Sequence, residues 1–154
     1  MDRLTPSRRS WLMSRVRSQH TSPEIRVRKA AHSVGLRFRL HRADLPGRPD
    51  LTLAKHHTVI FVHGCFWHRH PGCMKASTPK SRQAFWNEKF QTNRARDARV
   101  QLALKKLGWR VLVIWECETK RPKQLSRWLE KQFRLNKSTQ QMSVGLKRPT
   151  TSRK

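Results

Sequence analysis

The sequence is poor in acidic residues, with 9 Asp and Glu against 35 Lys and Arg among its 154 residues, for a net charge of +26. It also lacks any apolar stretch close to the ~20 residues that cross a bilayer. Its N-terminus has no continuous apolar segment of the kind found in secretion signals. We therefore expect an intracellular protein with no membrane partner. A polyanion, most commonly a nucleic acid, is the partner that the charge favours.

Cysteine is scarce as well, and three cysteines cannot close an even set of disulfides. Cys65, His70 and Cys73 have the spacing C-x4-H-x2-C, so a short loop could wrap one tetrahedral ion. Cys117 comes two residues after a strand-like run, where an adjacent strand would deliver it to the same edge of a sheet. A closed Cys3His set favours structural zinc and leaves no open position for a reacting water. The alternative is three unrelated buried thiols.

The chain divides into a basic N-terminal arm (1–20), a body (21–133) and a basic C-terminal tail (134–154). The tail contains six Lys or Arg, no acid, and many Ser, Thr and Gln. We expect both ends to be flexible and to lie along phosphates. For the tail, a solvated segment with only non-specific affinity is an equal alternative.

Hydrophobic periodicity within the body predicts one α/β domain. A capping box at 21–24 begins a helix that ends at Gly35, and Glu24 lies on its apolar face or acts only as a capping carboxylate. The other expected elements are a half-exposed strand at 36–41, an alternating strand at 50–54, buried strands at 58–62 and 110–115, and helices at 81–107 and after Pro122. This order implies an α/β sandwich with a central mixed sheet.

One acidic residue, Asp50, stands alone before the strand at 58–62, since the next Asp or Glu is Glu88. A metal nuclease usually collects two or more carboxylates for Mg²⁺. Here a histidine would have to act as the general base, and His68 is the best candidate, with His63 five residues away. An Asx-turn role after a proline is the alternative for Asp50.

The helix expected at 81–107 has a polar interruption in its apolar stripe. Asn93 and Asp97 lie on the stripe, which requires either a buried polar network or contact with a ligand. At the start of this helix Phe85–Trp86 should be near the surface. With Phe66–Trp67 these aromatics could stack on or wedge between bases, although aromatics at helical spacing more often form core.

Three segments together resemble a known family: LPGRPD at 45–50, FVHGCFWH at 61–68 and LGWRVLVIWEC at 107–117. They strongly resemble the very short patch repair DNA mismatch endonucleases, and the resemblance covers roughly residues 9–129. It implies a restriction-endonuclease-like fold, a three-layer sandwich. It also implies a strand-specific nick 5′ of the T in a T:G mismatch left by deamination of 5-methylcytosine, followed by short resynthesis.

The resemblance also implies roles for single residues. Asp50 and the main-chain carbonyl of Val62 would hold Mg²⁺, His68 would activate water with Glu24 in support, and His63 would contact the scissile phosphate. Some family members carry Thr in place of Val62, which is harmless if the main-chain oxygen is the ligand. The implied structural zinc ligands are Cys65, His70, Cys73 and Cys117, and the implied DNA contacts are Met13, Phe66, Trp67, Trp86, Lys89 and Asn93.

Partners and location follow from the same resemblance. Duplex DNA with a T:G mismatch is the expected partner, and a helper protein from mismatch repair is a further one, although the sequence shows no docking motif for it. A single mismatch needs one active site, so we expect a monomer. The bacterial cytoplasm is the expected location, with association to the nucleoid when the protein is bound to DNA. The alternatives are a zinc-stapled nucleic-acid-binding protein without catalysis and a relative that cuts unmismatched DNA.

Overall fold

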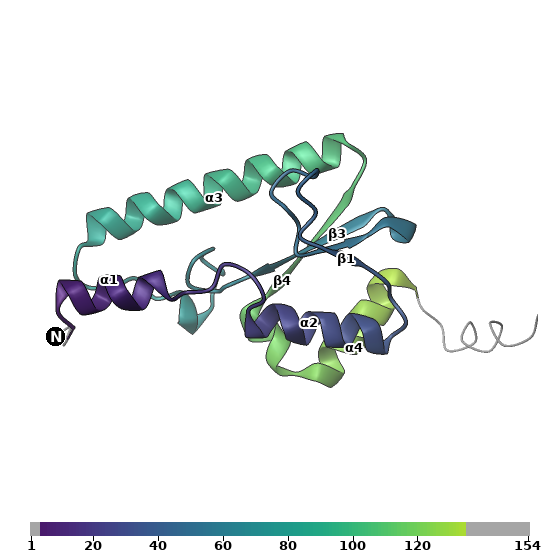
Figure 1. Ribbon diagram of the computed structural model, residues 1–154, viewed down its shortest axis with the longest axis horizontal. Helices are drawn as coiled ribbons and strands as arrows, with labels where there is room; N and C mark the ends of the chain where they lie inside the picture. Colours follow the sequence, from purple (N-terminus) through teal and green to yellow (C-terminus); the bar gives the residue numbers. More distant parts are fainter. Residues whose placement is uncertain (1–3, 135–154) are drawn as a thin grey trace, which may run out of the picture.

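The computed structural model describes residues 4–134, in which a sheet lies between two layers of helices (Figure 1). No helix within this range is long and apolar enough to span a membrane. The helices are α1 (Pro6–Ser14), α2 (Ser22–Ser33), α3 (Gln83–Lys106) and α4 (Pro122–Phe133). The strands are β1 (Arg39–Leu40), β2 (Leu51–Leu53), β3 (Thr58–His63) and β4 (Arg110–Trp115), with 3₁₀ turns η1 (Ala54–His56), η2 (Met74–Ala76) and η3 (Glu116–Lys120).

The sheet has the order β1-β2-β3-β4 and is mixed, as expected. β1, β2 and β3 pair antiparallel, and β3 pairs parallel with β4 after the crossover through α3. Leu51 lies opposite Ile60, and His63 lies opposite Trp115. The start of β2 and the carboxyl ends of β3 and β4 therefore meet at one edge, which brings Asp50 and the segments after β3 and β4 together.

β3 is the buried central strand that its uninterrupted apolar run predicts. Ile60 and Val62 belong to the hydrophobic cluster formed with α2 and α4. Val59 and Phe61 point to the other face and belong to the cluster beneath α3. Successive side chains of a strand alternate between faces, so a strand covered on both faces needs apolar residues at every position. The three expected layers are thus observed.

Two strand predictions are only partly correct. The segment expected to be a strand at 36–41 pairs with β2 only at Arg39 and Leu40, because Leu36 is instead 1% exposed in the core beside α2. β4 forms as predicted but is not fully buried: Ile114 is buried, Arg110 is exposed and the other residues of the strand are half-buried. β4 is partly exposed because it is the last strand in the sheet order. Among the described residues it therefore has a neighbouring strand, β3, on one side.

The N-terminal arm contains a helix that we did not expect. α1 begins after Thr5, whose hydroxyl accepts a hydrogen bond from the backbone N–H of Arg8 at 3.3 Å, and a proline occupies the first turn. All residues of α1 are exposed or half-exposed, so local capping rather than core packing accounts for it. The predicted basic tail, apart from residue 134, lies outside the described residues.

Candidate active site and metal-binding cluster

Asp50 lies directly before β2 and faces the end of β3. Its Oδ2 accepts a hydrogen bond from the backbone N–H of Val62 at 2.7 Å. The carboxylate thus bonds across the hairpin to another strand, which favours a site residue over an Asx turn. It is also placed beside the main chain of Val62, the residue whose carbonyl is expected to share a cation with it.

The environment of Asp50 opposes its negative charge. Burial raises its pKa to about 6, the hydrogen bond from Val62 acts in the opposite direction, and the charge of Glu24 adds to the increase. A half-buried carboxylate with a raised pKa is typical of functional sites, because a bound cation can supply the missing compensation.

This unfavourable charge predicts a pH-dependent gain of stability for Asp50→Asn. The folded-state pKa of about 6 lies above the unfolded value of about 3.9, so the proton stabilises the fold below pH ~4 and this stability is lost as the pH rises through 6. In magnesium-free buffer we expect the variant to exceed the wild type by about 1–3 kcal/mol at pH 7.5. Urea unfolding at pH 4.5 and 7.5 checks this, and an equal gap at both pH values would contradict it.

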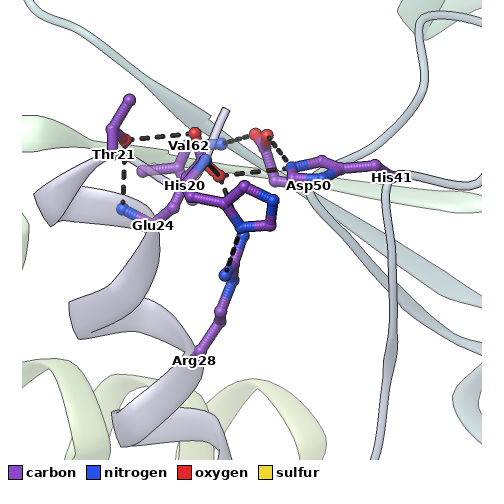
Figure 2. A network of polar contacts seen from close by, with 7 residues as sticks. All are labelled: His20, Thr21, Glu24, Arg28, His41, Asp50 and Val62. Carbon is purple, nitrogen blue, oxygen red and sulfur yellow. Dashed lines mark hydrogen bonds and ion pairs between the residues drawn. The ribbon is translucent and has the colours of Figure 1, made fainter. Parts of the chain in front are cut away.

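Glu24 is 3% exposed and stands at the centre of a polar network at the start of α2 (Figure 2). The hydroxyl of Thr21 accepts from the backbone N–H of Glu24 at 3.4 Å and donates to its Oε1 at 3.1 Å, so one half of the predicted capping box is formed. Its Oε2 accepts from the backbone N–H of His20 at 2.9 Å, from Arg28 at 3.0 Å and from His41 Nε2 at 3.2 Å. The apolar face of α2 thus delivers a buried carboxylate to the edge of the sheet.

Glu24 is expected to support His68, but the carboxylate that contacts His68 in the structure is a different one. His68 Nδ1 lies 2.5 Å from Asp97 Oδ2, and Asp97 comes from α3 rather than α2. The ring of His63 stacks on that of His68, with centroids 3.9 Å apart and planes at 9°. The interruption of the apolar stripe by Asp97 is therefore explained by the polar network that it predicts.

Burial and neighbouring charges shift the pKa values of His63 and Asp97. Burial, followed by the neighbouring His68, lowers the pKa of His63 to about 4, so its ring is neutral at pH 7. Burial alone would raise the pKa of Asp97, but the hydrogen bond and charge of His68 outweigh it and hold that pKa below its usual range. The arrangement is an ionised carboxylate that orients an imidazole, with a neutral imidazole stacked on it.

An aromatic cluster covers the start of α3. The ring of Phe66 meets those of Trp86 and Phe90 at 5.4 and 5.2 Å, and the ring of Trp67 lies 6.0 Å from that of Trp86. Phe85 is exposed as expected, but Trp86 is only 8% exposed because the neighbouring rings cover it. The expectation of a surface position is thus wrong for Trp86.

The remaining predicted DNA contacts lie on two helices. Asn93 is buried and its amide donates to the backbone carbonyl of Trp67 at 3.1 Å, so it holds the loop that carries Phe66 and Trp67. Lys89 is exposed on α3, and Met13 is 43% exposed on α1.

Cys65, His70, Cys73 and Cys117 form a compact cluster whose ligand atoms all lie within 4.8 Å of one another. His70 Nδ1 is 3.6 Å from the sulfur of Cys65 and 3.4 Å from that of Cys117. A tetrahedron with Zn–S near 2.3 Å and Zn–N near 2.0 Å has S···N edges of about 3.5 Å. The four residues could therefore hold a metal ion.

The loop that carries this cluster closes by a local turn. Gly72 has φ 70°, in the left-handed region, and the N–H of Cys73 donates to the carbonyl of His70 at 3.3 Å. The ring of His70 stacks on Trp115 at 4.3 Å and 9°. Burial raises the pKa of the Cys65 thiol to about 12, so a cation is needed to favour its thiolate.

Sequence reasoning missed the histidine His41 and the partner of His68. His41 has φ 44°, which is uncommon for a residue other than glycine, but its sequence context gives no sign of this conformation. Asp97 was singled out by its position on an apolar stripe, yet periodicity alone could not name the residue that it bonds.

The fold and the site together indicate the class of protein. A strongly basic α/β protein gathers a buried carboxylate, a carboxylate–imidazole pair and a Cys/His cluster at one end of a mixed sheet, an arrangement suited to hydrolysis of a polyanion. The comparisons with known proteins give the family. A family model described as DNA mismatch endonuclease Vsr matches residues 1–75.

Curated relatives extend this match over most of the chain. A type II nicking enzyme, V.XorIIP of Xanthomonas oryzae pv. oryzae, is 56% identical over 76% of this chain and 85% of its own. V.NmeAIP of Neisseria meningitidis, also a type II nicking enzyme, is 44% identical over 77% and 84%. The DNA mismatch endonuclease Vsr of Escherichia coli is 44% identical over 71% and 69%. The chain belongs to the Vsr family and is a DNA endonuclease, which rules against the non-catalytic alternative.

Proposed function

We propose that this endonuclease nicks one strand of duplex DNA 5′ of the T in a T:G mismatch, with Mg²⁺ as its catalytic cation. The names of the relatives, a mismatch endonuclease and nicking enzymes, support a single-strand cut. The observation that carries the proposal is the His68–Asp97 bond of 2.5 Å beside the stacked ring of His63. His63 ends β3 and His68 follows it, while Asp50 lies directly before β2, so the proposed base and cation ligand lie at the same end of the sheet.

Asp50 and the main-chain carbonyl of Val62 are the proposed Mg²⁺ ligands. The 2.7 Å hydrogen bond between the two residues holds the carboxylate against this part of the main chain. Mg²⁺ prefers oxygen ligands and keeps several waters, so one carboxylate, one carbonyl and phosphate oxygens form a suitable set. When bound, the cation supplies charge stabilisation at the phosphate and a more acidic water.

His68 is the proposed general base. A carboxylate can only accept, so Nδ1 of His68 carries the hydrogen in its bond to Asp97, and Nε2 is left as the basic nitrogen. Asp97 fixes this tautomer and stabilises the imidazolium that forms when the proton arrives. The neutral ring of His63 contacts the scissile phosphate by hydrogen bonding rather than by charge.

Asp97 therefore acts as a positioning residue, and Asp97→Asn should lower kcat by on the order of 10²–10⁴-fold. The amide preserves shape but can donate to Nδ1, which moves the imidazole hydrogen to Nε2. KM for DNA should stay within about twofold, because phosphate contacts carry the affinity. Single-turnover nicking kinetics test this, with Glu88→Gln, an exposed carboxylate on the same helix, as the matched control. Equal loss in both variants would show a charge effect instead.

The Cys/His cluster is the proposed structural zinc site. Its four soft or borderline ligands fill a tetrahedron and leave no position for a reacting water, so this ion would join the loop after β3 to the end of β4 rather than take part in hydrolysis.

Mismatch recognition is proposed to use the aromatic cluster and the two helices beside it. Phe66 and Trp67 are half-buried and backed by Trp86, so they form a rigid wedge for the major groove. Met13 on α1 would enter from the minor groove, and Lys89 and Asn93 would lie near the bases. A T:G pair is held more weakly than a normal pair, so unstacking beside it costs less and becomes a source of selectivity.

The proposal is tested with end-labelled duplexes that carry T:G or T:A in a cytosine-methylation context. We expect one Mg²⁺-dependent nick 5′ of the mismatched T and cutting of T:A at least about 10²-fold slower, because a few kcal/mol of unstacking cost separates the two. Comparable cutting of the T:A duplex would establish the alternative of a relative that acts on unmismatched DNA. Sedimentation of the same samples tests the proposed monomer, and the proposed mismatch-repair helper can be added in the assay.

A further inference from the structure

His41 lies between the buried carboxylate of Glu24 and the half-buried carboxylate of Asp50 at the end of the sheet (Figure 2). Its Nε2 is 3.2 Å from Glu24 Oε2 and 3.6 Å from Asp50 Oδ1, and its side chain is 10% exposed. We infer that His41 is a positioning residue for endonucleolytic cleavage: its hydrogen bond to Glu24 fixes the imidazole so that Nε2 lies beside the carboxylate of Asp50 and favours one orientation of that carboxylate. The inference rests on the proposed role of Asp50 as the Mg²⁺ ligand.

The anchor is Glu24, whose position is fixed from several sides. Its Oε2 accepts from the backbone N–H of His20 and from the guanidinium of Arg28, and its Oε1 accepts from the hydroxyl of Thr21. A carboxylate oxygen offers only lone pairs, so Nε2 of His41 must carry the hydrogen that joins the two residues. This nitrogen therefore has no lone pair for a cation, and His41 acts through Asp50 rather than as a ligand itself.

Each oxygen of the Asp50 carboxylate consequently has a neighbouring nitrogen. Oδ2 accepts from the N–H of Val62 at 2.7 Å, while Oδ1 lies 3.6 Å from Nε2 of His41, a distance longer than a hydrogen bond. The second contact is electrostatic, and it opposes both rotation of the carboxylate and its repulsion from Glu24. Groups that orient a metal ligand from outside typically change metal affinity or activity 10–100-fold when they are removed.

The backbone of His41 supports the same role. Its φ of 44° lies in the left-handed region, where residues other than glycine are uncommon and carry a cost. Its ring also meets that of His20 edge-on, with centroids 5.2 Å apart. The chain thus adopts a less common backbone conformation at His41, one that six other non-glycine residues share, and this conformation places Nε2 between the two carboxylates.

Two variants test the N–H donor and the ring of His41 separately. His41→Phe keeps a ring and removes the donor, whereas His41→Gln keeps an N–H donor and removes the ring. We expect His41→Phe to weaken Mn²⁺ binding, followed by electron paramagnetic resonance, and to lower kcat on a T:G duplex, each by about 10–100-fold, with KM for DNA within about twofold. His41→Gln should stay within about threefold of the wild type. His32→Gln, a histidine near the far end of α2, is the matched control.

The outcomes distinguish this inference from the function on which it rests. Wild-type Mn²⁺ affinity and kcat in His41→Phe, or an equal loss in His41→Gln, would overturn the role of His41 alone. Unchanged Mn²⁺ affinity and nicking in Asp50→Ala would overturn the proposed metal ligand, and the role of His41 with it. Thermal melting monitors folding, and if the Phe variant does not fold, His41→Ala provides the same comparison with His41→Gln.

Discussion

Replacing Asp50 with Ala is expected to abolish nicking of a T:G duplex, with a loss on the order of 10³-fold or more in kcat. Asp50 is the proposed carboxylate ligand of Mg²⁺, and the next acidic residue after it is Glu88, so no carboxylate in the segment that follows it up to the start of α3 can take its place. DNA binding should persist or tighten slightly, since the net charge rises from +26 to +27. Single-turnover nicking and fluorescence anisotropy on the same duplex measure the two properties separately.

The matched control for this variant is Asp44→Ala. Asp44 lies six residues upstream, is exposed and pairs with Arg42, so its loss changes the net charge equally without touching the site. Wild-type nicking in Asp44→Ala together with its loss in Asp50→Ala would support the assignment. Nicking that survives in Asp50→Ala would remove the proposed cation ligand, and equal loss in both variants would point to DNA affinity instead.

The second large effect is expected from removal of the metal at the Cys/His cluster. Structural zinc contributes about 10–16 kcal/mol of apparent binding free energy in small zinc-dependent domains, and a whole domain is stable by only about 5–15 kcal/mol. We therefore expect Cys117→Ala to lose its bound zinc, from one ion per chain to none, and to unfold at least about 10 °C below the wild type.

Elemental analysis and thermal melting measure these two quantities on purified protein. Wild-type protein stripped with a strong chelator should melt like Cys117→Ala and recover when zinc is restored, whereas the variant should not recover. A wild-type chain that contains no zinc, or a variant with unchanged melting, would leave the cluster as a group of free thiols without a structural metal.

The sequence allowed prediction of the elements whose signals are local. Thr21 and Glu24 mark the start of α2 by their own spacing, and the apolar run of β3 shows burial on both faces because each residue adds to the same pattern. The spacing of Cys65, His70 and Cys73 likewise depends on one short loop. Each of these features is encoded within a few neighbouring residues, so one segment is enough to identify it.

Contacts between distant segments could not be predicted in this way. Asp97 and His68 are 29 residues apart, and Glu24 and His41 are 17 apart. Their pairing depends on how α3 and the segment before β1 dock onto the sheet, which periodicity does not specify. The same limit explains the error at Trp86, which is buried by rings from a different segment, and at β4, whose exposure depends on its place in the sheet order.

The hydrogen bond between Val62 and Asp50 also gives the site a reporter of its own. The amide of Val62 is bonded to a side chain at 2.7 Å, although it lies within a strand. Its exchange with deuterated solvent therefore depends on the carboxylate as well as on the stability of the sheet. In Asp50→Ala we expect faster exchange at this one amide, with the rest of β3 still protected. Magnetic resonance would then report the loosening of the site in the absence of DNA.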